Sequence, residues 1–208
     1  MGSEMCIRDS SLTGPKNENG PADPLIVHPD SRRMSLETKA FNEGARALVY
    51  WAALLEDMEL VHEDEKVREK CDDYLGLLTP VIKGYLTDKA MATTIDCQQV
   101  FGGHGFIEEW GMSQFVRDTR IALIYEGANG VQALDLVGRK LARKGGRALM
   151  SLNAEIDEFL AEHKDNEKIA DFMGGLTESK KQLTEGTCLL YTSPSPRDLS
   201  TSRMPSSA

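Results

Sequence analysis

The sequence predicts an all-α fold, a helical bundle in which consecutive helices lie antiparallel. Apolar residues recur every three or four positions over several long segments, which places them on one face of a helix. Capping residues and turns that contain glycine or proline separate these segments. No segment alternates apolar and polar residues convincingly, as a half-buried strand does, and the sequence lacks the glycine-rich fingerprint of a Rossmann fold.

The composition is that of a soluble globular protein, with 27% charged and 40% hydrophobic residues among 208. A net charge of −9 argues against general nucleic-acid binding, which needs a basic surface. No apolar run approaches the roughly 20 residues that span a bilayer, and no signal-peptide pattern opens the chain. Four cysteines without metal-ligand spacing predict reduced thiols in a cytoplasmic protein and no metal site: Cys6, Cys71, Cys97 and Cys188.

The two ends of the chain differ from its middle. Residues 188–208 have neither helical nor strand periodicity, and they resemble translated sequencing-adapter DNA, as residues 1–10 do when read from the opposite strand. We expect these ends to be artefacts and the natural protein to continue beyond both; the alternative is a natural disordered tail. Residues 11–30 are rich in Pro, Gly, Asn and Asp and predict a loop.

Three helices are expected in the first half of the middle segment. Ser31 is a plausible N-cap for a helix that runs to about residue 60, and a second helix starts near Asp64. Thr79-Pro80 predicts a fresh start, with Thr as the cap and Pro in the first turn of a third helix. That helix ends near Phe101, where Gly102-Gly103 suits a left-handed C-terminal cap.

Shorter helical segments follow. A short helix is expected over 113–123, and a long helix from Glu126 to the pair Gly145-Gly146, which weakens or ends it. Residues 31–150 therefore form the predicted bundle. Residues 151–187 add further amphipathic helices, and residues 188–208 form the adapter-like disordered tail.

Two motifs carry the functional information, the glycine-rich turn at 98–105 (Gln-Gln-Val-Phe-Gly-Gly-His-Gly) and the segment Ile124-Tyr125-Glu126-Gly127. Their order and separation resemble the C-terminal helical domain of acyl-CoA dehydrogenases. Residues 131–141 and the His28-Pro29-Asp30 segment resemble a branch of larger bacterial members that includes 3-methylmercaptopropionyl-CoA dehydrogenase. We expect the similarity to cover about residues 11–150 and to extend to residue 187.

The resemblance implies a catalytic role for Glu126. The matching glutamate removes the α-proton of an acyl-CoA thioester while the β-hydrogen leaves as hydride to FAD, which gives the trans-2-enoyl-CoA of fatty acid β-oxidation. A carboxylate performs such proton abstraction best in a dry pocket, for which neighbouring apolar residues such as Ile124 and Tyr125 could form a wall. From the residues alone, a Glu at a helix start is more often structural.

The resemblance also implies cofactor contacts. Gln99, Gly102 and Gly103 match the turn that contacts the FAD of a neighbouring subunit, which implies a homodimer or a tetramer built from dimers. Gly127 and Ala128 match residues beside the flavin, but the family usually has threonine at position 128. Ala128 lacks that hydroxyl donor, so this one contact is in doubt. From the residues alone, the glycine turn is a helix cap.

Other expectations concern the complete protein. The family's N-terminal helical domain and β-domain are missing, so we expect this fragment alone to be inactive and its parent to pass electrons to an electron-transfer flavoprotein. An acyl-CoA oxidase of the same fold and a non-catalytic helical assembly module stay open as alternatives. The acyl chain of the substrate stays open as well.

Overall fold

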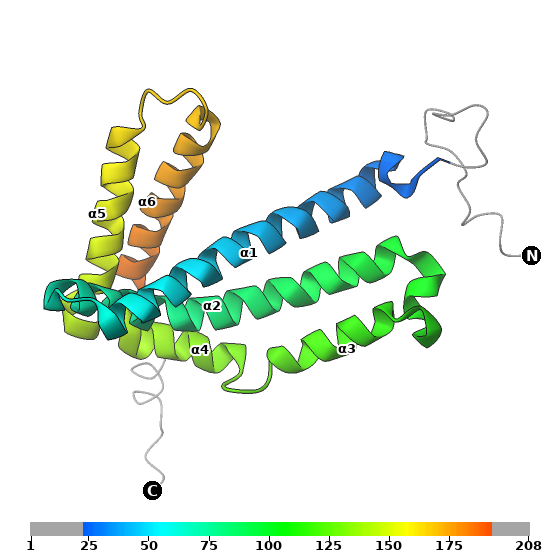
Figure 1. Cartoon of the computed structure of the whole chain (residues 1–208), viewed down its shortest axis with the longest axis horizontal. Coiled ribbons are helices and arrows are strands. Elements are labelled where there is room, and N and C mark those ends of the chain that lie inside the picture. The colour runs from blue at the N-terminus through cyan, green and yellow to red at the C-terminus, as the bar shows by residue number, and fades with distance from the viewer. Residues whose placement is uncertain (1–22, 193–208) are drawn as a thin grey trace, which may run out of the picture. The chain divides into compact units, whose positions relative to one another are not determined.

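The computed structural model describes residues 23–192, and every element in that part is helical (Figure 1). The predicted all-α fold is confirmed. The predicted adapter-like segment 1–10, most of the predicted loop 11–30 and residues 193–208 lie outside the described part. The chain divides into two compact units, and the boundary between them falls after Leu136.

Helix α1 spans Pro29–Val61 and follows a single 3-10 turn at Leu25–Val27. Proline occupies the first helical position, where its missing N–H is no loss, and His28 is the N-cap. The predicted cap at Ser31 is wrong, because the helix starts two residues earlier. Ser31 lies inside the helix, and its carbonyl accepts a hydrogen bond from Ser35 Oγ at 2.7 Å.

Helix α2 spans Glu65–Val100, and Asp64 caps it by accepting a hydrogen bond from the Lys66 N–H at 2.9 Å. The predicted helix start at Thr79-Pro80 is wrong, since α2 passes through Pro80 without a break. Thr79 Oγ1 bonds back to the Leu75 carbonyl at 2.6 Å, as a residue inside a helix does. Burial of Leu77, Leu78 and Pro80 offsets the hydrogen bond that proline cannot make.

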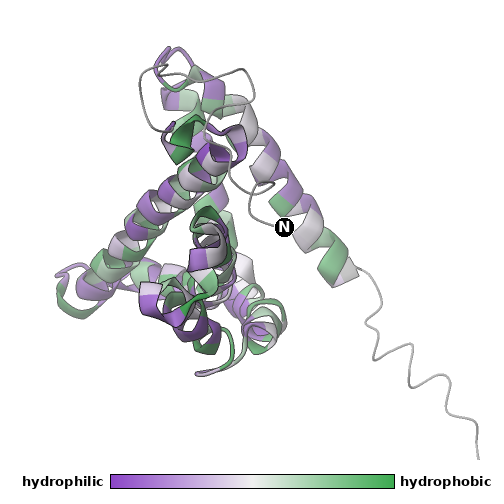
Figure 2. Cartoon of the chain, turned by 90° about the vertical axis from the view of Figure 1, so that its right-hand side faces the viewer, coloured by the Kyte–Doolittle hydropathy of each residue, from purple (hydrophilic) through white to green (hydrophobic). Residues whose placement is uncertain are grey.

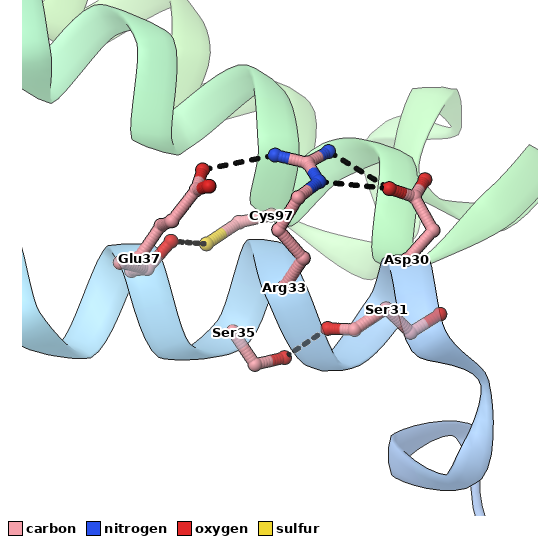
Figure 3. Close-up of polar contacts among 7 residues, drawn as sticks. Asp30, Ser31, Arg33, Ser35, Glu37 and Cys97 are labelled. Carbon is pink, nitrogen blue, oxygen red and sulfur yellow. Dashed lines mark hydrogen bonds and ion pairs between the residues drawn. The ribbon is translucent and has the colours of Figure 1, made fainter.

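Helices α1 and α2 pack against each other along their length, joined by a short loop (Figure 1). Trp51 of α1 meets Tyr74 of α2 edge to face, with ring centroids 6.0 Å apart. Near the start of α1, Arg33 bridges Asp30 and Glu37, and Cys97 of α2 lies against the same stretch of helix (Figure 3). The most buried apolar side chains of this unit are Met34, Leu55, Cys71, Tyr74, Leu77, Leu78 and Met112.

The glycine turn ends α2 and begins a tight reversal. Gly102 has a φ of +60°, which confirms the predicted left-handed cap. A 3-10 turn over Gly102–Phe106 brings Gly105 back onto α2, where its carbonyl accepts from Gln98 Nε2 at 3.0 Å. A Cβ at position 105 would lie 2.3 Å from the Gln98 carbonyl oxygen, so only glycine fits there.

Helix α3 spans Met112–Ala122 and leads to α4, Asn129–Asp135, and both pack on α2 (Figure 1). The predicted helix start at Glu126 is wrong, because α4 begins three residues later. After α4 the chain forms a π turn at Leu136–Lys140 and a 3-10 turn at Arg143–Gly146. Positive φ at Lys144, Gly145 and Gly146 confirms that the glycine pair interrupts the helix.

The second unit is a pair of helices, α5 over Arg147–Glu162 and α6 over Ala170–Thr192 (Figure 1). Lys180 of α6 pairs with Asp157 of α5, and Tyr191 donates to the Val137 carbonyl at 2.8 Å. Helix α6 therefore extends into the predicted adapter-like segment as far as Thr192.

Many large apolar side chains remain exposed. Hydrophobic and hydrophilic residues alternate along the helices (Figure 2). The exposed fraction is 80% for Phe106 and 63% for Phe115. Among residues 23–192, no helix has the length and apolar character that a bilayer crossing requires.

The close approach of Gly105 to α2 predicts that a larger side chain at this position lowers the stability of the fold. Gly105→Ala should destabilise the fold by about 1–3 kcal/mol, because the added Cβ overlaps the Gln98 carbonyl. Gly103→Ala is the matched control, since no atom lies within 4 Å of a Cβ built there. Urea unfolding measures both, and equal midpoints for the two variants would contradict the packing described.

The cysteines should differ in reactivity. Burial, and then the nearby Glu59, raise the pKa of the Cys71 thiol, whereas Cys188 is exposed. Among the three cysteines of the described part, Cys71, Cys97 and Cys188, iodoacetamide labelling followed by mass spectrometry should modify Cys188 first and Cys71 last. Folding raises the pKa of Cys71 above its unfolded value of about 8.5. The neutral thiol therefore contributes fully to the free energy of unfolding below about pH 8.5, and this contribution is lost as the pH rises through the pKa of the folded state. Labelling of Cys71 as fast as Cys188 would disprove its burial.

Candidate functional site

The predicted catalytic residue lies in a tight turn between α3 and α4. Glu126 has a φ of +52° and Gly127 a φ of +85°, so two successive residues have left-handed backbone. This conformation is unfavourable for glutamate by about 1 kcal/mol and persists only where surrounding contacts enforce it. The Asn129 N–H donates to the Leu123 carbonyl at 3.3 Å and so closes the turn.

Gln132, on the first turn of α4, reaches back to this turn. Its Nε2 donates to the carbonyls of Glu126 and Gly127 at 3.3 and 3.4 Å. The positive φ at position 127 favours glycine, and a Cβ there would lie 2.9 Å from the same nitrogen, so the Gln132 side chain would have to shift.

Three consecutive backbone N–H groups, those of Glu126, Gly127 and Ala128, donate to no acceptor within residues 23–192. Ala128 is the N-cap of α4 and provides no side-chain cap. Successive unpaired amides in a turn can hydrogen-bond a negative charge. The turn can therefore stabilise an oxyanion beside the Glu126 carboxylate.

The side chain of Glu126 is exposed in this chain. Ile121, Ile124 and Tyr125, which could form an apolar wall, are 55%, 52% and 49% exposed. Apolar surface is thus present near the carboxylate but does not enclose it. Substrate or further protein would have to exclude water from the site.

The second predicted group is the glycine turn at the other end of α3 (Figure 1). Gln99 is exposed, and no atom lies within 4 Å of a Cβ built on Gly102 or Gly103, so a ligand can approach the backbone closely. A hollow beside the turn is lined by Leu25, Val100, Phe101, His104 and Trp110. The turn therefore combines an accessible backbone, an exposed amide side chain and a neighbouring aromatic hollow.

The structure does not bring these two groups together. Helix α3 has 11 residues and separates them by about 16 Å along its axis. A small molecule at Glu126 would therefore lie far from the glycine turn of the same chain. This separation agrees with the expectation that the turn serves the FAD of another subunit, although that assignment stays a prediction.

Side-chain bonds to which the sequence analysis gave no role hold both groups. Gln98 bonds to Gly105 and so fixes the reversal of the glycine turn. The Asn129 side chain bonds to Gly84, Thr87 and Asp88 of α2, more than forty positions away. Nothing in the local sequence marks the partners of Asn129. In the described part of the chain, no cluster of three or more His, Cys, Asp or Glu side chains could hold a metal ion.

Residues 16–141 match the family described as acyl-CoA dehydrogenase, C-terminal domain. The chain is 45% identical to 3-methylmercaptopropionyl-CoA dehydrogenase of Ruegeria pomeroyi over 60% of the chain and 21% of that protein. It is 35% identical to a butyryl-CoA dehydrogenase of Syntrophomonas wolfei over 82% of the chain and 27% of the relative. A broad-specificity linear acyl-CoA dehydrogenase of Mycobacterium tuberculosis is 35% identical over 74% of the chain and 25% of its own length.

The chain thus spans about a fifth to a quarter of the length of these relatives. The family match covers the glycine turn, the Glu126 turn and α4, the same elements that carry the two motifs. The predicted resemblance, including the branch of 3-methylmercaptopropionyl-CoA dehydrogenase, is confirmed. The chain belongs to the acyl-CoA dehydrogenase family, of which it represents the helical C-terminal domain.

Proposed function

We propose that the chain is part of a flavin-dependent acyl-CoA dehydrogenase in which Glu126 is the catalytic base. One observation carries the proposal: the carboxylate follows α3 in a left-handed turn whose three successive amides are unpaired within residues 23–192. A base and an oxyanion-binding group therefore lie in the same short segment. The names of the relatives support the acyl-CoA thioester as the class of substrate.

The residues of this chain divide the chemistry between a side chain and the backbone. The Glu126 carboxylate takes the α-proton of the thioester, and the electron pair of that C–H bond forms the double bond. The amide of Glu126 donates to the thioester carbonyl and stabilises the negative charge that develops on its oxygen. Bound FAD would supply the acceptor for the β-hydrogen and its electron pair, which would leave the trans-2-enoyl thioester as product.

The cofactor contacts are proposed for Gln99, Gly102 and Gly103 at one end of α3 and for Gly127 and Ala128 at the other. The first group fits because its backbone is open to approach. At position 128 the chain offers only backbone, since alanine lacks a polar side chain. A site shared between subunits, an electron-transfer flavoprotein as electron acceptor and a cytoplasmic location belong to the same proposal.

A non-catalytic assembly module is the second candidate, and exposed apolar side chains such as Phe106 and Phe115 favour it. That surface alone does not account for a glutamate held in left-handed backbone, which is the reason to prefer the enzyme. An oxidase of the same fold would use the same base.

Glu126→Gln tests the base directly. In the flavin-containing enzyme that carries these residues, we expect turnover to fall by about 10²–10⁴-fold, because the amide cannot accept the α-proton. The flavin absorbance spectrum should be unchanged, since the backbone of the turn is kept. Glu108→Gln, another exposed glutamate, is the control. Retained turnover in Glu126→Gln would rule out the assignment.

Ala128→Thr tests the missing hydroxyl. The N-cap of α4 has no side-chain hydrogen bond, so threonine should stabilise the chain by about 0.5–2 kcal/mol in urea unfolding. It should also tighten flavin binding, which equilibrium titration measures. Ala133→Thr places the same side chain inside α4 and should instead lower stability by about 0.5 kcal/mol. If position 128 behaved like position 133, the capping argument would be wrong.

A further inference from the structure

The side chain of Asn129 connects the first residue of α4 to the middle of α2. Its Oδ1 accepts from Lys83 Nζ at 2.8 Å. Its Nδ2, which carries two hydrogens, lies within hydrogen-bond distance of three acceptors: the Gly84 carbonyl at 3.2 Å, Thr87 Oγ1 at 2.9 Å and Asp88 Oδ1 at 2.7 Å. Both ends of one small amide are therefore bonded to a short stretch of α2.

The surrounding groups fix which way this amide points. Thr87 Oγ1 lies 2.7 Å from the Lys83 carbonyl and 3.2 Å from Asn129 Oδ1, so its hydroxyl can donate to either, and Lys83 and Asp88 decide the orientation of the amide. Lys83 can only donate, and the Asp88 carboxylate can only accept. A side chain at position 129 must therefore accept on one side and donate on the other, which asparagine does and neither aspartate nor alanine can.

Asn129 is also the residue that closes the Glu126 turn. Its N–H bonds to the Leu123 carbonyl, and only Gly127 and Ala128 separate it from Glu126. The left-handed φ of +52° at Glu126 is retained because both ends of the turn are held. On one side α3 holds the chain at Leu123; on the other the Asn129 amide holds it to α2.

We propose that Asn129 is a positioning residue for Glu126. By joining α4 to α2 through Lys83, Gly84, Thr87 and Asp88, it keeps the turn in the backbone conformation that directs the carboxylate and the unpaired amides toward one substrate. The inference rests on the proposed function only in taking Glu126 as the base. The claim that the Asn129 amide fixes the turn does not depend on Glu126 being the base.

Asn129→Asp is the sharpest variant, because it keeps the size of the side chain and the acceptor for Lys83. It removes the donor and sets a carboxylate against Asp88, which should break the bond of 2.7 Å. The paired change Asn129→Asp with Asp88→Asn reverses donor and acceptor, so that the amide introduced at 88 donates to the carboxylate introduced at 129. Gln114→Ala is the control, since Gln114 also donates to an aspartate, Asp118 at 2.6 Å, but lies on α3 away from the turn.

The first measurement is amide hydrogen exchange on the full 208-residue chain. The amides of Asn129, Val131 and Gln132, which bond to Leu123 and Ala128, report on the turn, and the amides of α5 serve as an internal reference. We expect about tenfold faster exchange at the three reporters in Asn129→Asp, since loss of a charge-assisted bond is worth roughly that factor. The paired change should restore exchange to within about threefold, and Gln114→Ala should leave it unaltered. Unchanged exchange in Asn129→Asp, or an equal increase in Gln114→Ala, would overturn the inference.

The second measurement is turnover of the flavin-containing enzyme. A positioning role predicts that Asn129→Asp lowers kcat by about 10–100-fold with little change in KM, and that the paired change restores much of it. A purely structural role would lower the yield of folded enzyme but not its kcat. If Glu126→Gln lowers turnover by about 10²–10⁴-fold while Asn129→Asp leaves kcat intact, the positioning proposal alone fails. If Glu126→Gln leaves turnover intact, the proposed function fails, and the exchange result still decides what holds the turn.

Discussion

The packing of α2 is the constraint on which the rest of residues 23–136 depends. Helices α1, α3 and α4 and the glycine turn all contact α2, so α2 sets the position of each motif. Its continuity through Pro80 matters for this reason. The residues that hold α4, from Lys83 to Asp88, and the residue that holds the glycine turn, Gln98, all follow the proline. A break at Pro80 would uncouple them from the half of α2 that carries Cys71 and Tyr74.

Much of the fold could be predicted from the sequence, because periodicity and capping are local signals. The all-α class, the Asp64 start of α2 and the left-handed cap at Gly102 follow from residue types over a few positions. Pro80 shows where this reasoning fails. Proline favours a helix start locally, but burial of Leu77, Leu78 and Pro80 itself holds one continuous helix. Tertiary packing keeps α2 continuous through Pro80, and a short stretch of sequence carries no information about that packing.

The candidate site, too, could be predicted from the sequence only in part. The motifs identified Glu126 and the glycine turn as the residues of interest, and their roles stay proposals. The start of α4 at Asn129 instead of Glu126 could not be predicted, because it depends on left-handed backbone at two residues and on bonds from Asn129 and Gln132. Those bonds join positions that are distant in sequence or run from side chain to backbone, and they leave no periodic pattern. The exposed apolar residues beside Glu126 agree with a site that becomes dry only when substrate and further protein cover it.

The backbone at Glu126 has a consequence for protein engineering. Glycine, and to a lesser degree asparagine, adopts a φ of +52° more readily than glutamate does. A library selected only for thermal resistance should therefore drift away from glutamate at this position. A library selected for turnover should keep it. Position 126 thus marks a trade-off between conformational preference and chemistry, and stabilising designs for this family should hold that residue constant.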